Sequence, residues 1–271
     1  MSARAEDALD GRAALRRSPV ADPLWALGLV KRYDGVVALG GVDLRVPRGR
    51  VVGLVGPNGS GKTTLLHAVA GLTRLDGGFA RVAGAPAGGR DARSRLALVP
   101  DEPAGFDELT VAELVSLVHA LWRAGPEAGR RAALLLEAFG LAARANDRLG
   151  ALSRGLRRQA AAVAAFSLAP PLVLVDEATA TLDPEAVVVL REAVSALARR
   201  GSGVLLATQD LHFAQSACDD LVLLQRGHIV ERGTPEELLR RHGTASLEGV
   251  FLAAVGDAGL RERVRDGLRA L

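Results

Sequence analysis

The chain has 271 residues, enough for one large domain or for a domain with a subdomain. Its 34 basic and 31 acidic residues leave a net charge of only +3 and are interspersed, so we expect no nucleic-acid partner. The single cysteine, Cys218, excludes an intrachain disulfide and a cysteine metal site, and it fits a reducing compartment.

The chain contains no segment that reads as a membrane anchor. Residues 1–22 are polar, with charges throughout and no apolar core, so we expect a disordered tail rather than a secretory signal. The longest apolar stretch, residues 160–175, contains Ser167 and two consecutive prolines, which makes it too short and too interrupted to cross a bilayer. Any role at a membrane is therefore expected to require another polypeptide.

A glycine-rich loop is the most informative feature of the first half. Residues 24–55 alternate apolar runs with turn signals, which predicts short antiparallel strands. The last run leads into Gly-Pro-Asn-Gly-Ser-Gly-Lys-Thr-Thr at residues 56–64 and then into a helix that we expect to end at Gly71. Strand, loop and helix in this order are typical of a phosphate-binding loop, whose backbone N–H groups surround an anion. A glycine-rich turn without a ligand is the alternative.

The lysine in this loop supports a binding role. Only Lys31 and Lys62 are lysines among the 34 basic residues, which indicates that position 62 requires a compact ammonium rather than a planar guanidinium. The predicted phosphate-binding residues are Gly56, Pro57, Asn58, Gly59, Ser60, Gly61, Lys62, Thr63 and Thr64.

The middle of the chain changes from strand patterns to helix patterns. Residues 77–100 predict strands with glycine-rich turns, whereas residues 109–169 have helical periodicity with breaks near Gly125 and Gly150. A further helix is predicted over residues 184–200, between two buried strands. This order indicates an α/β core with a helical subdomain.

Two acidic residues follow the first of those buried strands. The strands are predicted at residues 172–175 and 204–207, and Asp176 and Glu177 come directly after the first. This is the edge of the sheet where the phosphate loop also lies. Asp176 is a candidate to hold Mg²⁺ together with Thr63, and Glu177 is a candidate to orient and deprotonate a water molecule. Acids that only favour a helix N-terminus are the alternative.

Two more motifs lie on either side of the acidic pair in the sequence. Leu-Ser-Arg-Gly-Leu at residues 152–156 precedes an alanine-rich helix that we expect to start near Arg157, and Thr-Leu-Asp at residues 181–183 follows the acidic pair. Over about residues 24–240 the chain resembles the ATP-binding subunit of an ABC transporter. Residues 246–256 resemble the end of the drug-exporter-like branch. The resemblance implies an α/β P-loop NTPase (RecA-like) core with an antiparallel β subdomain and an inserted helical subdomain.

The resemblance also implies Mg²⁺ and ATP as cofactors, with two ATP molecules between the subunits of a dimer. Ser153 and Gly155 are expected to contact the γ-phosphate held by the opposite subunit. Tyr33 is expected to stack on adenine, and an aromatic ring that fills the core is the alternative. With the phosphate loop, the ATP-binding residues implied are Tyr33, Ser153, Gly155 and Asp183.

The chain departs from the family pattern at three places. Asp101 stands where the family usually has a glutamine that senses the γ-phosphate; it is a third candidate metal ligand, a residue that faces the partner, or an acid of a surface turn. Arg154 and Leu156 stand where glycine and glutamine are usual, and Arg154 either adds charge near the nucleotide or lies in solvent. Gln209 replaces the switch histidine and can orient water without carrying a proton charge, with His212 as a possible substitute. The catalytic candidates are Glu177, Lys62 and Gln209.

We expect an N-terminal tail over residues 1–22, an ATP-binding domain over 23–241 with its helical subdomain at about 104–166, and a C-terminal helical extension over 242–271. The predicted function is a peripheral ATPase in the cytoplasm, on the inner face of the cell membrane. It pairs with a second ATP-binding subunit, as a homo- or heterodimer, and drives export by a separate transmembrane permease that docks near residues 101–109. One alternative is a weakly hydrolysing or regulatory subunit paired with an active partner. Another is an ABC ATPase of DNA repair or translation, which usually carries a second ATPase module or long insertions.

Overall fold

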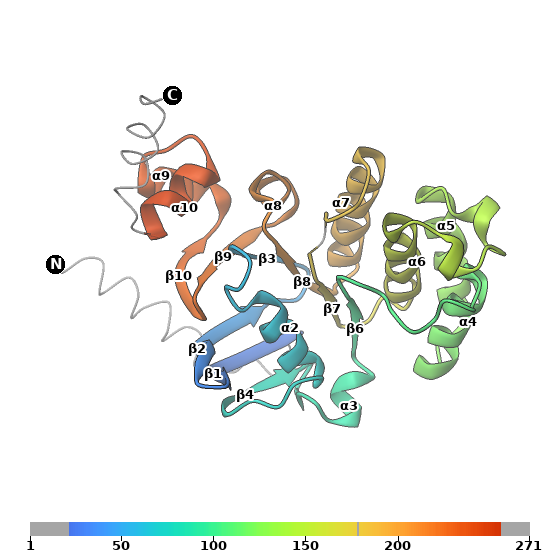
Figure 1. Cartoon of the computed structure of the whole chain (residues 1–271), viewed down its shortest axis with the longest axis horizontal. Helices are drawn as coiled ribbons and strands as arrows, with labels where there is room; N and C mark the ends of the chain where they lie inside the picture. The colour runs from blue at the N-terminus through green and yellow to red at the C-terminus, as the bar shows by residue number, and fades with distance from the viewer. Residues whose placement is uncertain (1–21, 178, 256–271) are drawn as a thin grey trace.

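A computed structural model of the chain describes residues 22–177 and 179–255 (Figure 1). Nearly all of the predicted tail, and residues 256–271 of the predicted extension, lie outside the described residues. The strands are β1 (Leu24–Tyr33), β2 (Val36–Val46), β3 (Val51–Val55), β4 (Gly77–Val82), β5 (Ala85–Pro86), β6 (Leu96–Val99), β7 (Leu172–Val175), β8 (Gly203–Thr208), β9 (Asp220–Gln225) and β10 (His228–Gly233). The helices are α2 (Lys62–Ala70), α3 (Arg90–Arg93), α4 (Val111–Trp122), α5 (Pro126–Ala138), α6 (Arg154–Ser167), α7 (Pro184–Arg199), α8 (Leu211–Ala217), α9 (Pro235–His242) and α10 (Leu247–Val255), with 3-10 turns η1 (Ala142–Arg144) and η2 (Leu149–Ala151).

The first strands form an antiparallel sheet with the order β2-β1-β4-β5. Leu24, Ala26 and Leu29 of β1 are fully buried, and partly exposed residues lie between them, as expected for a sheet with one face toward the core. The register of β1 against β2 shifts between Ala26 and Leu29. The predicted antiparallel strands are therefore confirmed for β1 and β2.

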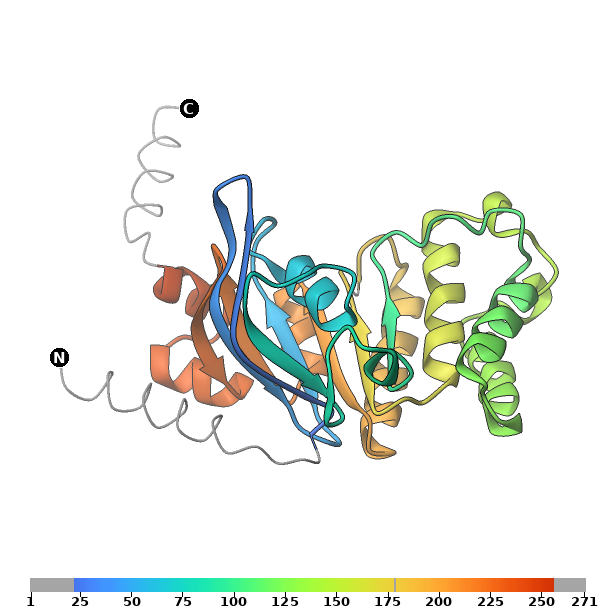
Figure 2. The same ribbon diagram turned by 90° about the horizontal axis from the view of Figure 1, so that it is seen from below.

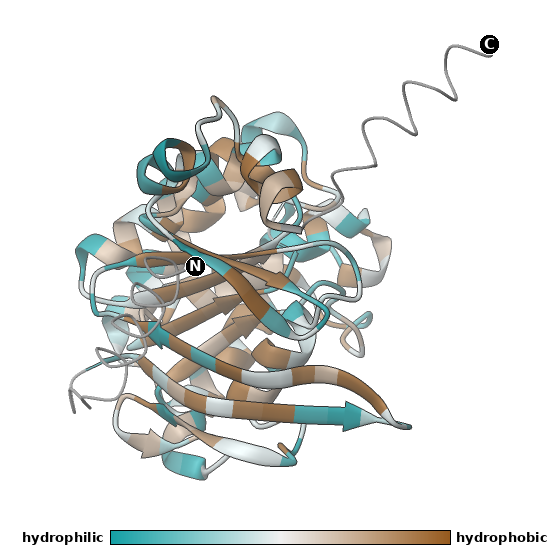
Figure 3. Cartoon of the chain, turned by 90° about the vertical axis from the view of Figure 1, so that its left-hand side faces the viewer, coloured by the Kyte–Doolittle hydropathy of each residue, from teal (hydrophilic) through white to brown (hydrophobic). Residues whose placement is uncertain are grey.

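The core sheet has the order β10-β9-β3-β8-β7-β6, and β3 pairs in parallel with both β8 and β9. The prediction of antiparallel pairing before the phosphate loop is therefore wrong for β3, a fully buried strand with a parallel neighbour on each side; only the edge strand β10 of this sheet is antiparallel to its neighbour, β9. The parallel pairing of β7 with β8 confirms the two strands predicted there, and α7 is their connecting helix. Strands in the interior are brown along most of their length in Figure 3.

Alternate residues of β3 face two hydrophobic clusters. Val51 and Val55 lie in the cluster that includes residues of α6 and α7, whereas Val52 and Leu54 lie in the cluster that includes residues of α2 and the antiparallel sheet. Successive residues of a strand point to opposite faces, so β3 is covered on both sides. The end of β3, where the phosphate loop begins, is thereby held in place.

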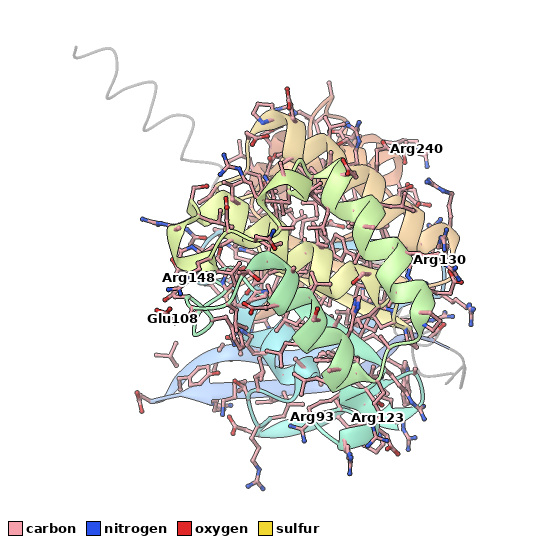
Figure 4. All side chains as sticks on the ribbon, turned by 90° about the vertical axis from the view of Figure 1, so that its right-hand side faces the viewer. Arg93, Glu108, Arg123, Arg130, Arg148 and Arg240 are labelled. Atoms are coloured by element: carbon pink, nitrogen blue, oxygen red, sulfur yellow. The ribbon has the colours of Figure 1, made fainter. Side chains whose placement is uncertain are left out.

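Helices α4, α5 and α6 lie together at one end of the molecule, and α9 and α10 lie at the opposite end (Figures 1 and 2). The helical periodicity predicted for residues 109–169 is confirmed, and its breaks fall where α5 begins at Pro126 and where η2 contains Gly150. We call α4, α5 and α6 with their connections the helical lobe. Figure 4 shows its outer face, where Arg148 and Glu108 form an exposed ion pair of 2.9 Å. Among the described residues, no helix combines the length and the apolar character that crossing a bilayer requires.

Candidate functional site

Residues 56–61 form a loop between β3 and α2, which confirms the predicted strand–loop–helix order. Gly59 and Gly61 have φ values of 77° and 108°, in the left-handed region that favours glycine. A Cβ atom on Gly61 would lie 2.3 Å from the carbonyl oxygen of Ala38 in β2, so no side chain fits there. Helix α2 ends, as predicted, at Gly71. The path of the loop is therefore fixed by backbone packing.

The ammonium of Lys62 lies inside this loop, and only 4% of the side chain is exposed. Its Nζ donates to the carbonyl oxygens of Gly56 and Pro57 at 2.8 and 3.3 Å and forms an ion pair with Oε1 of Glu177 at 3.1 Å. A buried ammonium requires such partners, because an unpaired charge in a low-dielectric interior is costly. The ion pair joins the phosphate loop to the end of β7.

Asp176 at the end of β7 is 1% exposed, and its Oδ1 accepts a hydrogen bond from Oγ1 of Thr63 at 3.2 Å. Burial raises the pKa of Asp176 above its ordinary value, and the charges of Glu177 and Asp101 raise it further, while the hydrogen bond from Thr63 acts in the opposite direction. Hydroxyl and carboxylate oxygens are ligands that a hard divalent cation prefers, and a cation here would offset the negative charge. The two residues therefore fit a magnesium ion.

Glu177 has a φ of 44°, an uncommon conformation for a residue with a side chain. Its side chain is 15% exposed and contacts Lys62, whereas the neighbouring Asp176 contacts Thr63. The adjacent carboxylates thus have separate partners. The alternative that they belong to a helix N-terminus is wrong, because the next helix, α7, begins only at Pro184.

The segment at residues 152–156 forms the start of α6, which begins at Arg154 and not near Arg157 as predicted. Ser153 is the N-cap, and its Oγ accepts a hydrogen bond from the backbone N–H of Leu156 at 3.3 Å. The cap starts the helix three residues earlier than the alanine-rich pattern indicates. Ser153 and Arg154 are exposed, which leaves both accessible to a partner.

Gly155 packs closely against the loop that precedes α7. A Cβ atom on Gly155 would lie 2.5 Å from the carbonyl oxygen of Thr181, which itself has a φ of 65°. Asp183 is the N-cap of α7, and its Oδ1 accepts a hydrogen bond from the N–H of Ala186 at 2.8 Å. Gly155 and Asp183 thus have structural roles within the chain, and their contacts with a nucleotide remain predictions.

Asp101 follows β6, and its Oδ1 accepts a hydrogen bond from Nη1 of Arg158 in α6 at 3.0 Å. The Asp101 side chain is half-exposed, whereas Arg158 is almost completely buried. Arg158 is a residue that the sequence analysis missed. The available signal was an arginine, directly after Arg157, near the start of a helix whose later residues are mostly alanine. The role of Asp101 as a metal ligand stays a prediction.

Gln209 follows β8 and is exposed, so its amide is free to turn toward a ligand. His212, the possible substitute for the missing switch histidine, is 88% exposed, and its Nε2 lies 3.4 Å from Oε1 of Glu248 in α10. The imidazole therefore faces the C-terminal helices, which argues against the substitution. Gln209 remains the candidate at this position.

Tyr33 ends β1 and is 46% exposed, so the alternative that it fills the core is wrong. The Nζ atom of Lys31 lies 5.0 Å from the centroid of its ring, and the same ammonium is paired with Asp76 at 3.4 Å. An accessible ring beside a cation suits stacking on a planar ligand. Stacking on adenine remains a prediction.

Comparisons with known proteins agree with this arrangement. The sequence profile of the ABC transporter family matches residues 39–180, which include the phosphate loop and both acidic residues. The chain is 38% identical over 214 residues to the daunorubicin/doxorubicin resistance ATP-binding protein DrrA of Streptomyces peucetius, a match that covers 78% of this chain and 65% of that protein. It therefore spans slightly less than two thirds of the length of that relative.

An import protein and a solved structure are also similar. The chain is 36% identical over 254 residues to the methionine import ATP-binding protein MetN of Streptomyces coelicolor, covering 87% of this chain and 72% of that protein. A solved structure of the ATP binding subunit of an ABC transporter matches with a TM-score of 0.81 and 31% identity, covering 86% of this chain and 99% of that one. Sequence and fold thus point to the same group of proteins.

Proposed function

The chain belongs to the ABC transporter family, and on that premise we propose that it binds and hydrolyses Mg-ATP in a dimer to drive transport by a separate permease. One observation carries the proposal: Lys62 and Thr63, the first residues of α2 after the phosphate loop, contact Glu177 and Asp176 at the end of β7 at 3.1 and 3.2 Å, respectively. Phosphoryl transfer to water needs such a combination of phosphate-binding, metal-binding and water-orienting groups.

In the proposed mechanism, the backbone N–H groups of the loop and the ammonium of Lys62 bind the β- and γ-phosphates. Thr63 and Asp176 hold Mg²⁺, which when bound neutralises charge that develops on the phosphates. Glu177 orients the attacking water and accepts its proton. A γ-phosphate bound by Lys62 competes with the ion pair between Lys62 and Glu177, and this competition leaves the carboxylate of Glu177 available to the water.

The remaining predicted residues act around this centre. The amide of Gln209 donates a hydrogen bond to the γ-phosphate or to the water, although it cannot carry a proton charge. Tyr33 stacks on the adenine ring. Ser153 and Gly155 contact the γ-phosphate held by the second subunit, whose own signature segment completes the site of this chain.

We propose that the permease docks at an apolar groove beside the helical lobe. The groove, with a volume of about 220 Å³, is lined by the segment after β6 and by α4 and α6. Pro103, Ala104 and Phe106, all within the predicted docking segment, contribute to it, and Phe106 is 46% exposed. Large apolar side chains at an accessible groove suit an amphipathic helix. Docking there places the chain on the inner face of the cell membrane.

Export is the proposed direction of transport, because the relative in Streptomyces peucetius is described as a drug-resistance protein. The methionine import protein has a similar sequence identity, so the direction depends on the permease rather than on the ATP-binding chain. Transport assays in vesicles that contain the permease would test the direction: accumulation of cargo on the ATP side would contradict export.

Hydrolysis is tested by the release of phosphate from Mg-ATP, with and without the permease. We expect Glu177→Gln to lower kcat by about 10²–10⁴-fold while ATP still binds, because a general base contributes this much. Glu185→Gln, at an exposed acid in the first turn of α7, is the matched control and should keep full activity. Full turnover by the Glu177 variant would remove this residue from the mechanism. ATP binding without turnover by the unsubstituted chain would favour a regulatory subunit instead.

A further inference from the structure

The guanidinium of Arg158 joins three separate segments of the site. Nη1 donates to Oδ1 of Asp101 and to the carbonyl oxygen of Ala180, both at 3.0 Å, and Nη2 donates to the carbonyl oxygen of Asp176. Asp101 follows β6, Asp176 follows β7, and Ala180 lies in the loop that leads to α7. A single side chain of α6 therefore connects the helical lobe to the strand ends that carry the acidic residues.

Burial makes these contacts obligatory. Arg158 is 3% exposed, whereas Asp101 is 51% exposed. A guanidinium stays charged at any pH that the protein tolerates and presents its N–H groups in a fixed planar fork. Its position in the interior is therefore stable only while an opposite charge and enough acceptors face it. Asp101 supplies the charge, and the two carbonyl oxygens supply the further acceptors.

We infer that Arg158 is a positioning residue for hydrolysis and that Asp101 acts as its counter-ion rather than as a ligand of the metal. The inference rests on the proposed function, because the group that is positioned is Glu177, the proposed base. Arg158 holds the backbone on both sides of this residue, at Asp176 and at Ala180. Because Arg158 belongs to the helix that contains Gly155 and that Ser153 caps, a shift of α6 changes the position of the base.

The first experiment separates positioning from nucleotide binding in the full-length chain. Arg158→Gln is expected to lower kcat by about tenfold or more and to change the KM for ATP by less than about threefold, because the loop around Lys62 is untouched. Arg158→Lys, which keeps the charge but loses the fork, should also lower kcat. Arg148→Gln is the matched control, since Arg148 forms an exposed ion pair of 2.9 Å with Glu108 (Figure 4). A kcat for Arg158→Gln within about twofold of the unsubstituted chain would overturn the inference.

The second experiment asks whether Asp101 serves the arginine or the metal. Asp101→Asn should lower kcat without changing the half-saturating Mg²⁺ concentration by more than about twofold. In the double variant Asp101→Asn with Arg158→Gln, kcat should stay within about threefold of that of Arg158→Gln alone, because Asp101 acts through the arginine. A Mg²⁺ requirement that rises about tenfold in Asp101→Asn, with kcat kept at saturating Mg²⁺, would overturn the inference and make Asp101 a ligand.

A third measurement keeps this inference distinct from the proposed function. The same single and double variants are compared by thermal unfolding without nucleotide. A coupling of at least about 2 °C between positions 101 and 158 supports the ion pair, and additive effects overturn it. An unsubstituted chain that does not hydrolyse ATP would count against the proposed function, while this coupling would still decide whether Asp101 is the counter-ion. If Arg158→Gln does not fold, Asp101→Asn at the half-exposed carboxylate carries the test.

Discussion

The phosphate loop and the start of α6 both present groups suited to phosphate, but they are held in place differently. Residues 56–61 follow directly from β3, and the left-handed conformation of Gly61 and its close approach to Ala38 in β2 fix the path of the loop. The start of α6 depends on remote partners, with Gly155 against the loop before α7 and Arg158 against Asp101. The loop is therefore preformed, whereas the second region depends on how the helical lobe sits against the core.

The largest expected effect is on ATP binding by the phosphate loop. In Gly61→Ala, both the φ of 108° and the 2.3 Å approach to Ala38 exclude the new methyl group. We expect ATP affinity to fall by about 100-fold, or about 3 kcal/mol. Gly59→Ala is the control, because its φ of 77° adds strain but nothing lies within 4 Å; it should cost about 1–2 kcal/mol. Equal losses in the two variants, measured by equilibrium titration with ATP, would contradict the packing argument.

The next effect is on the start of α6. In Gly155→Ala, the new methyl group meets the carbonyl oxygen of Thr181 at 2.5 Å. We expect a loss of about 1–3 kcal/mol in the free energy of unfolding and a roughly tenfold fall in kcat, with ATP affinity kept. Gly129→Ala in α5 meets nothing within 4 Å and should be stabilising by about 0.5–1 kcal/mol. If Gly155→Ala lost ATP affinity as strongly as Gly61→Ala, the two regions would not be independent.

Asp176 connects the two regions, because it accepts hydrogen bonds from Thr63 in α2 and from Arg158 in α6. The burial of its carboxylate lowers the stability of the folded protein. The pKa of an aspartate in an unfolded chain is about 3.9, and burial raises the pKa of Asp176 above this value in the folded protein. The folded state then binds the proton more tightly, so this residue lowers stability as the pH rises from about 4 through the folded pKa. In chelator without nucleotide, we expect Asp176→Asn to be more stable than the unsubstituted chain at pH 7, with a difference that shrinks toward pH 4. Denaturant unfolding at several pH values measures this; a less stable variant at pH 7 would contradict it.

The smallest expected effect is at Gln209, which is exposed beyond β8. Gln209→His restores the residue type usual in the family, and a histidine can donate a hydrogen bond as glutamine does. Steady-state turnover should stay within about threefold of the unsubstituted chain or rise. A steep fall would show that the site is built around glutamine at this position.

Local sequence patterns predicted the region of the phosphate loop well. The apolar run before Gly56, the glycine spacing and Lys62 are all within one short segment, so strand, loop and helix follow from neighbouring residues. The pairing of β3 with its neighbouring strands could not be predicted from such local patterns. Val52 lies beside Leu205 in β8 and Asp220 in β9, and no short-range pattern shows which distant strands will flank it.

The start of α6 and the contacts of this helix were harder to predict, for two physical reasons. The helix starts at Arg154 because the hydroxyl of Ser153 caps it, and this local signal was outweighed by the alanine-rich pattern further on. Arg158 was missed because an arginine in a helix usually lies at the surface. Its burial depends on Asp101, a residue 57 positions earlier in the chain.

The contacts of Arg158 also constrain how the sequence can evolve. Two of its acceptors are main-chain carbonyl oxygens, which every residue type provides. Position 180 can therefore vary without losing the contact, whereas position 101 must retain a negative charge as long as position 158 is arginine. Among related sequences, substitutions at 101 and 158 should accordingly occur together, as expected for a pair in direct contact.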